Sequence, residues 1–332
     1  MTDLLLVFTT TILAVAYSIP VQPAFADSVN EAAQQSRHLA DAGKWEDAGR
    51  VLEHRLSQTK QPTELARLKA ELAHYAEEWN TFFQKNDRLV QLQIEQARAA
   101  VQASGSKHAL AILETTEGQL TYWNALDGTN NWGPPTSHFD RGIQLYQELK
   151  DDVGLAEAVF YRGLVCQMQN QNELARKYFN EALELTKKTG DERLRSYVVR
   201  HIGYLQETAG QIDAARANFR QSLELRQKND MKAFVPFALI LLADFEKEQK
   251  HPDRAIQLAQ QAITSARSGN SPRALYSAQL TLAKLYLDNG KRTEARRLAE
   301  RSRAGAKAFG STGDAKDATD FLEKSAAAAP RT

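Results

Sequence analysis

Residues 163–182 read GLVCQMQNQNELARKYFNEA, and their pattern returns 40 positions later in residues 203–222, GYLQETAGQIDAARANFRQS. An alanine keeps this spacing along the second half of the chain, at Ala175, Ala215, Ala255 and Ala295. A small residue precedes each alanine by twelve positions, at Gly163, Gly203, Ala243 and Ala283. A fixed period of this length is typical of stacked repeats, in which each unit buries its apolar face against its neighbours.

Helical periodicity fills the chain between these small residues. From residue 27 onward, apolar side chains recur at i, i+3, i+4 and i+7, which is the pattern of amphipathic helices. Turn signals such as Ala209-Gly210 separate the helices, because glycine or asparagine supplies the left-handed residue that ends a helix. The pattern predicts helix pairs in the blocks 28–61, 62–105, 106–151, 152–191, 192–231, 232–271 and 272–311.

The small and aromatic positions resemble the tetratricopeptide repeat (TPR) family. In that family a small residue lies early in the first helix of a pair, an alanine starts the second helix, and an aromatic residue follows four positions later. Gly163, Ala175 and Phe179 fill these positions, and Phe219 takes the aromatic place in the next repeat. The period is longer than the usual 34 residues, as in the repeats of bacterial regulators and kinesin-light-chain-like arrays. The resemblance implies an all-α, right-handed α-solenoid of six to seven antiparallel helix pairs.

The regularity of the pattern divides the chain into four segments. We expect a signal peptide at 1–26, irregular N-terminal helical repeats at 27–151, regular TPR-like repeats at 152–311, and a capping helix with a disordered tail at 312–332. Residues 127–137 (DGTNNWGPPTS) are predicted to form a loop that is several residues longer than the other turns. Polar loops of that size in a solenoid are often functional.

The first 26 residues differ from the rest of the chain. Residues 4–16 (LLLVFTTTILAVA) carry no charge, and Ala24-Phe25-Ala26 is a small-x-small triplet typical of signal-peptide cleavage sites. The apolar stretch is shorter than the roughly 20 residues of a membrane span. No Lys or Arg precedes it, which is atypical of a signal peptide. We therefore expect export to the periplasm or the extracellular space, with cleavage after Ala26 and no membrane span thereafter. An uncleaved N-terminal anchor and a misread start are the alternatives.

Composition and motifs disfavour several classes of function. Lys plus Arg is 42 against 41 for Asp plus Glu, so the net charge is +1 and binding to nucleic acid is not expected. The single cysteine, Cys166, cannot form an internal disulfide, and it occupies a position where the family buries a tyrosine. The seven histidines share no ligand spacing, and no phosphate loop or paired-carboxylate motif is present. We expect no catalytic residues, no metal and no cofactor, and hence no enzyme.

The first helix of each pair lines the concave side of a TPR superhelix, and the resemblance places a candidate partner site there. The implied groove residues are Phe160, Tyr161, Gln167, Tyr197, Arg200, His201, Tyr204, Phe237 and Asp244. Aromatic side chains beside an arginine and a histidine suit an extended or helical peptide, because Tyr and Arg dominate interface energetics. The alternative is that the long helices pack these residues into a tight superhelix.

The sequence therefore predicts a non-catalytic scaffold or adaptor for protein–protein interaction in the cell envelope. Its partner is expected to be another protein or a peptide in the concave groove. The alternative is a regulatory repeat protein that senses a peptide or a small ligand. Since the sequence shows no DNA-binding or catalytic domain, such a sensor would act through a separate output protein. The residues do not specify an oligomeric state.

Overall fold

The computed structural model describes residues 28–327, and the predicted signal peptide (1–26) and the last residues of the predicted tail (328–332) lie outside this range. The described residues form α-helices and no strands, arranged as seven antiparallel pairs and one capping helix. The first three pairs are α1 (Val29–Asp41) with α2 (Trp45–Gln58), α3 (Pro62–Phe82) with α4 (Asp87–Ser104), and α5 (Lys107–Asn124) with α6 (Gly133–Leu149). The next four are α7 (Asp152–Met168) with α8 (Asn172–Thr189), α9 (Glu192–Thr208) with α10 (Ile212–Lys228), α11 (Val235–Glu248) with α12 (Pro252–Ser268), and α13 (Pro272–Asp288) with α14 (Arg292–Phe309). The capping helix is α15 (Thr312–Ala327). The predicted all-α, right-handed solenoid is confirmed.

Small residues allow the two helices of a pair to approach closely. A Cβ atom on Gly163 would lie 2.6 Å from the ring of Phe179, and one on Gly203 would lie 2.5 Å from the ring of Phe219. Both phenylalanines are fully buried. In the α11–α12 pair the aromatic position holds Ala259, which is also buried. The repeat spacing in the sequence is therefore the spacing of these close helix–helix contacts.

The first helices of the pairs form the inner layer of the solenoid. Most consecutive first helices contact one another: α1 with α3, α3 with α5, α5 with α7, α7 with α9 and α11 with α13. Among residues 28–327, consecutive second helices do not pack against one another in this way. The stack therefore curves toward the first helices, whose inward faces are available to line a groove or a cavity.

The connection between α5 and α6 is shorter than the loop predicted for residues 127–137. A π-helical turn, η1 (Ala125–Thr129), continues α5, and Gly128 within it has a φ of 128°. Helix α6 then begins at Gly133, with proline in its first turn. The loop prediction was wrong for residues 133–137 because proline fits the first turn of a helix, where its missing N–H has no intrahelical partner to lose.

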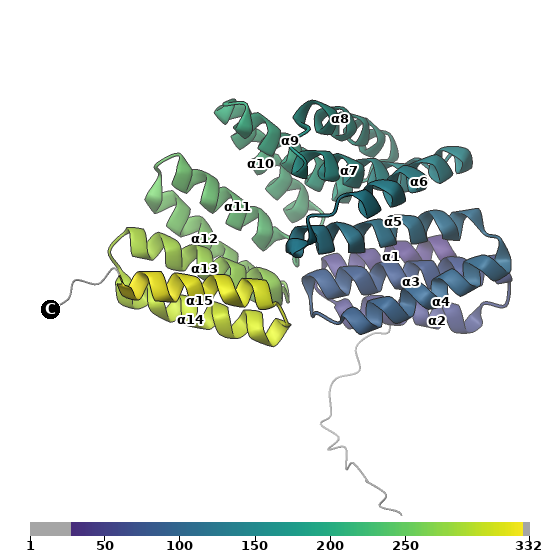
Figure 1. The fold of residues 1–332 in the computed structure, drawn as a ribbon, viewed down its shortest axis with the longest axis horizontal. Coiled ribbons are helices and arrows are strands. Elements are labelled where there is room, and N and C mark those ends of the chain that lie inside the picture. Colours follow the sequence, from purple (N-terminus) through teal and green to yellow (C-terminus); the bar gives the residue numbers. More distant parts are fainter. Residues whose placement is uncertain (1–27, 328–332) are drawn as a thin grey trace, which may run out of the picture.

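The two ends of the curved stack meet. In Figure 1, α1–α5 and α11–α15 lie beside each other, and α6–α10 form the arch that joins them. Four hydrogen bonds among the described residues connect these ends: Ala233 N to Asp41 O (2.9 Å), Asn270 Nδ2 to Gly43 O (3.1 Å), Arg273 Nη1 to Thr81 O (2.7 Å) and Lys85 N to Phe309 O (3.1 Å). Gly43 has a φ of +81°, and a Cβ there would lie 2.2 Å from the carbonyl oxygen of Gly269. The described chain is therefore a closed arc.

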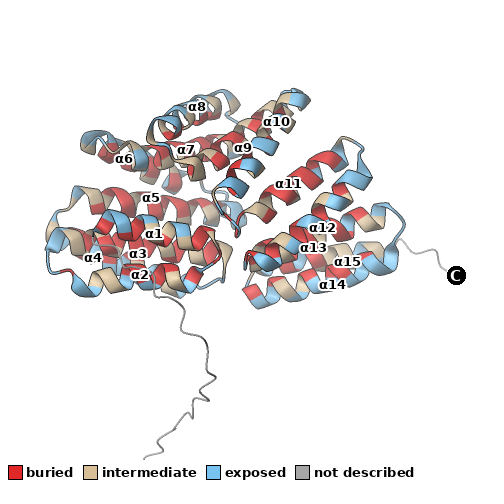
Figure 2. Ribbon diagram, turned by 180° about the vertical axis from the view of Figure 1, so that it is seen from behind, coloured by how far each residue is buried: buried red, intermediate tan, exposed pale blue. Residues whose placement is uncertain are grey.

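An aromatic cluster fills the junction between the ends. The ring of Trp45 lies 5.9 Å from that of Phe83 and 6.2 Å from that of Phe234, measured between centroids. Phe82 packs edge-on against Phe234 at 5.1 Å. Figure 2 shows buried residues along the facing sides of the helices and exposed residues at their outer sides and turns. Because this cluster occupies the junction, the open space on the inner side lies toward the N-terminal half.

Candidate functional site

A cavity of about 730 Å³ lies on the inner side of the N-terminal half. Its walls come from α1, α3, α5, α6, α7 and α9. The charged and imidazole side chains of the walls include Arg37, Asp41, Arg67, Glu71, His74, His108, Asp151, Glu157 and Arg193. Concave, pre-formed cavities of this size are the usual place for a ligand.

One face of α3 carries polar residues into the interior. Glu71, His74 and Glu78 follow a spacing of three and four residues, which places them on the same side of the helix. All three are less than a tenth exposed. Arg37 of α1 pairs with Glu71, its Nη1 lying 3.2 Å from Oε2. Because a buried carboxylate without a partner is costly, this pairing stabilises the closure of α1 over α3.

Arg193 of α9 joins the cavity wall to the junction of the ends. Its Nε lies 2.9 Å from Oδ1 of Asp41, and its Nη2 lies 2.6 Å from Oε1 of Glu78. The guanidinium also lies over the rings of Tyr197 and Phe234, 6.0 Å and 5.9 Å from their centroids. One side chain thus connects α9 with α1 and α3.

Glu157 of α7 faces His74 across the cavity wall. Oε1 of Glu157 accepts a hydrogen bond from Nε2 of Gln119 at 3.0 Å and lies 3.8 Å from Nε2 of His74. His74 is 5% exposed, and its Nε2 has no hydrogen-bond partner among the described residues. In this wall, the Glu157 carboxylate therefore accepts its hydrogen bond from an amide. The Nε2 nitrogen of His74, among the described residues, has no hydrogen-bond partner.

Burial shifts the ionisation of the carboxyl groups around this wall. Burial raises the pKa of Asp41 to about 6, although Arg193 acts against the rise. Burial also raises the pKa of Glu77 to about 7, against the hydrogen bond from Thr81 Oγ1 at 2.8 Å. Burial acts to raise the pKa of Glu78, but the positive charge around it, chiefly that of Arg193, lowers it. Arg193 therefore keeps the carboxylate of Glu78 ionised in the interior.

The nine predicted groove residues all lie on the inner helices α7, α9 and α11, and none of them lines the cavity. Phe160 and His201 are buried, and Asp244 is exposed. The remaining six are half-buried, namely Tyr161, Gln167, Tyr197, Arg200, Tyr204 and Phe237. Packing within the superhelix, the alternative to a groove, accounts for the two buried side chains.

The structure brings most of these side chains into one aromatic cluster. The ring of Phe160 lies 5.3 Å from Tyr161, 6.4 Å from Tyr197 and 5.5 Å from His201. Tyr204 extends the cluster, 5.4 Å from His201. Two residues lie apart from it. Phe237 packs against Phe82 and Phe234 at the junction of the ends, and Asp244 stands exposed on α11.

Three polar members of the predicted set form a hydrogen-bond chain. Arg200 Nη2 lies 3.0 Å from His201 Nε2, and His201 Nδ1 lies 2.7 Å from Gln167 Oε1. Since a guanidinium only donates, Nε2 accepts and Nδ1 carries the proton that goes to Gln167. Burial, with Arg200 and Arg226 nearby, holds the pKa of His201 well below its usual value, which agrees with this neutral form.

The sequence did not reveal the residues that line the cavity. Glu71, His74 and Glu78 are polar, and helical periodicity assigns polar positions to the solvent side. The signal available in the sequence is that these residues interrupt the alanine-rich face of a 21-residue helix. Their inward orientation depends on α1 and α9 covering them, which periodicity within one helix does not encode.

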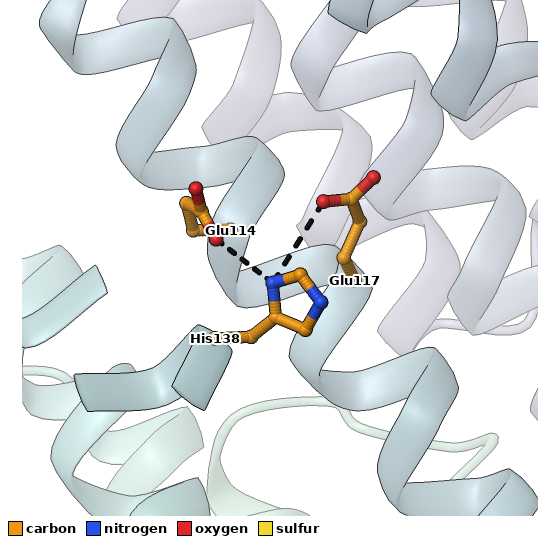
Figure 3. Close-up of side chains that lie close together, drawn as sticks. All are labelled: Glu114, Glu117 and His138. Carbon is orange, nitrogen blue, oxygen red and sulfur yellow. Dashed lines mark hydrogen bonds and ion pairs between the residues drawn. The ribbon is translucent and has the colours of Figure 1, made fainter. Parts of the chain in front are cut away.

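A second polar cluster links α5 and α6 (Figure 3). His138 Nδ1 lies 2.8 Å from Glu114 Oε2 and 3.8 Å from Glu117 Oε2. Among residues 28–327, these three side chains have donor atoms close enough to hold a metal ion, within 4.8 Å of one another. However, Arg141 pairs with Glu114 and Arg98 with Glu117, so two guanidinium groups already balance the two carboxylates. The hydrogen bond that His138 donates to Glu114 raises the pKa of His138, as expected for an ion-pair network.

A more open cleft of about 800 Å³ lies between the ends of α10, α11 and α12. Its central carboxylate, Glu246, is buried and lies 2.8 Å from Nδ1 of His251. Arg216 and Arg254 approach the same carboxylate at 3.4 Å and 3.5 Å. Because these groups satisfy one another, the cleft offers fewer free polar atoms than the inner cavity.

The stacked pairs and the inner layer of first helices define an α-solenoid of the TPR type. A sequence model of the family described as the MalT-like TPR region matches residues 149–320, which is more than half of the chain. The chain belongs to this family.

Solved structures share the fold at low sequence identity. The structure of NprR in complex with its cognate peptide NprX has a TM-score of 0.65 and 12% identity, covering 91% of this chain and 83% of that chain. A Rap protein complexed with Competence and Sporulation Factor has a TM-score of 0.59 and 12% identity, covering 90% and 86%. A signal transduction ATPase from Pyrococcus horikoshii with a TPR sensor has a TM-score of 0.53 and 12% identity, covering 89% and 44%. At such identities the likeness establishes the fold alone.

No curated protein sequence matches this chain. Between residues 28 and 327, none of the helices combines the length and the apolarity that crossing a bilayer requires.

Proposed function

We propose that this protein is a non-catalytic interaction protein that binds a peptide, or a peptide segment of another protein, on the inner side of its solenoid. The observation that carries the proposal is the cavity of about 730 Å³ between α1 and the inner helices. Its walls offer both donors and acceptors, which are the groups that peptide backbones and side chains use. The likeness to NprR and a Rap protein, both solved with bound factors, supports this choice of ligand.

The state of the single cysteine supports a non-catalytic role. Cys166 is fully buried, and burial raises the pKa of its thiol. Arg162 Nη1 lies 2.9 Å from its Sγ. Because the thiolate is the reactive form, a buried thiol of raised pKa is a poor nucleophile.

The proposal is tested with peptides selected from a random display library on residues 27–332. Their affinities are then measured by calorimetry on the wild type and on Val153→Trp, since Val153 is exposed at the cavity. We expect the bulky indole to weaken binding by about tenfold or more by filling the entrance. Leu174→Trp, on the exposed side of α8, is the matched control and should leave the affinity unchanged. Equal affinities for all three proteins would place the peptide elsewhere.

A second candidate, a ligand-sensing regulator, is favoured by the position of Arg193. The same side chain lines the cavity and pairs with Asp41 at the junction of the ends. A ligand that competes for this guanidinium would change how tightly the ends close, and a separate output protein would respond to that change. Small-angle scattering with and without a selected peptide distinguishes the regulator from the scaffold. A change in the radius of gyration supports the regulator, and an unchanged radius supports the scaffold.

We also propose that the protein acts after export to the periplasm or the extracellular space. The support is the uncharged stretch at residues 4–16 and the triplet Ala24-Phe25-Ala26. N-terminal sequencing of protein from its native host tests this. A mature chain that starts at Asp27 supports export, and an intact Met1 in a cytoplasmic fraction contradicts it.

A further inference from the structure

The charges around His74 do not balance. Four carboxyl groups lie on or against this part of the cavity wall: Asp41, Glu71, Glu78 and Glu157. Two guanidinium groups face them, those of Arg37 and Arg193. With all six groups ionised the local sum is −2, four negative charges against two positive ones. An excess of buried negative charge is unfavourable unless a cation or protons compensate it.

The distribution of partners shows where a compensating cation would lie. Glu71 has Arg37 at 3.2 Å, and both Asp41 and Glu78 have Arg193 within 3.0 Å. Glu157 has no arginine or lysine in an ion pair among residues 28–327, and its hydrogen bond comes from the neutral amide of Gln119. Glu157 is therefore the one of these four carboxylates without an arginine partner, and it accounts for one of the two excess negative charges.

A second observation marks the same place. Nε2 of His74 is buried in the cavity wall without a hydrogen-bond partner, 3.8 Å from Oε1 of Glu157. In the neutral imidazole with a proton on Nδ1, Nε2 is an acceptor. Two acceptors at this separation can both receive N–H groups from one ammonium nitrogen placed between them at ordinary hydrogen-bond distances of about 2.9 Å.

We propose that Glu157 and His74 form a subsite for a primary ammonium group of the ligand, such as a lysine side chain. The inference rests on the proposed binding of a peptide in this cavity and adds the chemistry that the cavity selects. Hydrogen bonds between an ammonium and a carboxylate are short and about twice as strong as neutral ones, and the low dielectric of the cavity strengthens them. The subsite thus favours a peptide that presents a lysine to the part of the cavity wall formed by α3 and α7.

The test uses two blocked tripeptides, acetyl-Ala-Lys-Ala-amide and the same peptide with an acetylated lysine side chain. Calorimetry on the wild type is expected to show about tenfold or more weaker binding of the acetylated probe. Glu157→Gln should abolish this preference, so that both probes bind alike. Asp152→Asn is the matched control, because Asp152 lies on the same helix and pairs with Lys188 outside the cavity. It should keep the wild-type preference.

A measurement on the wild type keeps the test independent of the folding of Glu157→Gln. Nitrogen-15 spectra of the His74 imidazole are recorded at pH 7 during titration with the lysine probe. We expect the Nε2 resonance to move as this nitrogen accepts the hydrogen bond from the probe. A ring that carries both protons in the free protein, with no response to the probe, would overturn the proposal, because His74 itself would then supply the compensating charge.

The outcomes separate this inference from the proposed function. If selected peptides bind at the cavity but neither probe shows a preference for the free amine, the ammonium subsite is rejected and peptide binding stands. If the lysine probe binds through Glu157 while selected peptides bind elsewhere, the subsite stands and the proposed function is rejected. If neither blocked probe binds at millimolar concentration, the subsite is rejected.

Discussion

Arg193 and Asp41 are joined across 152 residues of sequence, with Nε of the arginine 2.9 Å and 3.0 Å from the two carboxylate oxygens. The same guanidinium donates to Glu78 at 2.6 Å. One inner helix of the arch is thereby tied to the N-terminal repeats. Repeat proteins are stabilised mainly by contacts between neighbours, so a connection over this distance distinguishes the chain from an open solenoid.

We expect Arg193→Met to destabilise the protein by about 3–5 kcal/mol, because it leaves Asp41 and Glu78 buried without their partner. The contact between the ends should loosen, and the radius of gyration in small-angle scattering should rise. Arg296→Met is the control, since Arg296 makes an exposed pair with Glu300 and should contribute less than about 1 kcal/mol. Similar small losses for the two variants in urea unfolding would show that the ion pair does not hold the ends together.

The packing of the repeats is tested at Gly203. A methyl group there would lie 2.5 Å from the buried ring of Phe219, so Gly203→Ala should destabilise by about 1–3 kcal/mol. Hydrogen exchange should show lost protection that starts in α9 and α10 and spreads to their neighbours. Gly313→Ala adds the same methyl group to α15 where nothing lies within 4 Å, and it should be neutral or slightly stabilising. Uniform loss of protection across all pairs would contradict a fold built from neighbour contacts.

Much of the fold could be predicted from the sequence because its determinants are local. Gly163 and Phe179 belong to adjacent helices, and the contact they make repeats with the period of the chain. Seven helix pairs therefore lie in the seven predicted blocks. The loop at residues 127–137 was predicted too long, because Pro134 and Pro135 lie in the first turn of α6.

The closed arc and the cavity could not be predicted in this way. Whether Arg193 reaches Asp41 depends on the rotation between pairs, summed over the whole arch, and no single repeat specifies that sum. The groove residues inferred from the family positions lie on the expected helices. However, the junction cluster around Phe234 occupies part of the inner side, and the cavity is displaced toward α1 and α3.

The ionisation of Glu77 predicts a pH dependence. Its pKa is about 7 in the folded protein against 4.5 for an unperturbed glutamate, so the native state retains a proton that the unfolded chain releases. The resulting stability is fully present below about pH 4.5 and is lost as pH rises through about 7. Glu77→Gln keeps the acceptor for Thr81 and removes the charge. Its stability relative to the wild type should be about 2 kcal/mol greater at pH 8.5 than at pH 5.5. Equal differences at the two pH values would contradict the shift.

The aromatic cluster on α9 has its own test. If the partner extends from the cavity onto α9, Tyr204→Ala should weaken binding of a selected peptide by about 2 kcal/mol, the scale of an interface hot spot. Folding should remain cooperative, as judged by thermal unfolding. Tyr204 also lies 5.3 Å from the ring of Phe219. Large destabilisation with unchanged affinity would therefore assign this side chain to the core, as the packing alternative holds.

The most direct test of peptide binding on the inner side is photo-crosslinking from defined positions. Benzoylphenylalanine is placed at Val153, which lines the cavity and is half exposed, or at Glu224, which is exposed on the second-helix side in α10. Each protein is irradiated with a display-selected peptide, and the crosslinked product is identified by mass spectrometry. The proposed function predicts a crosslink from position 153 and none from position 224. A crosslink from position 224 alone would show that the peptide binds the outer surface, and it would contradict an inner binding site.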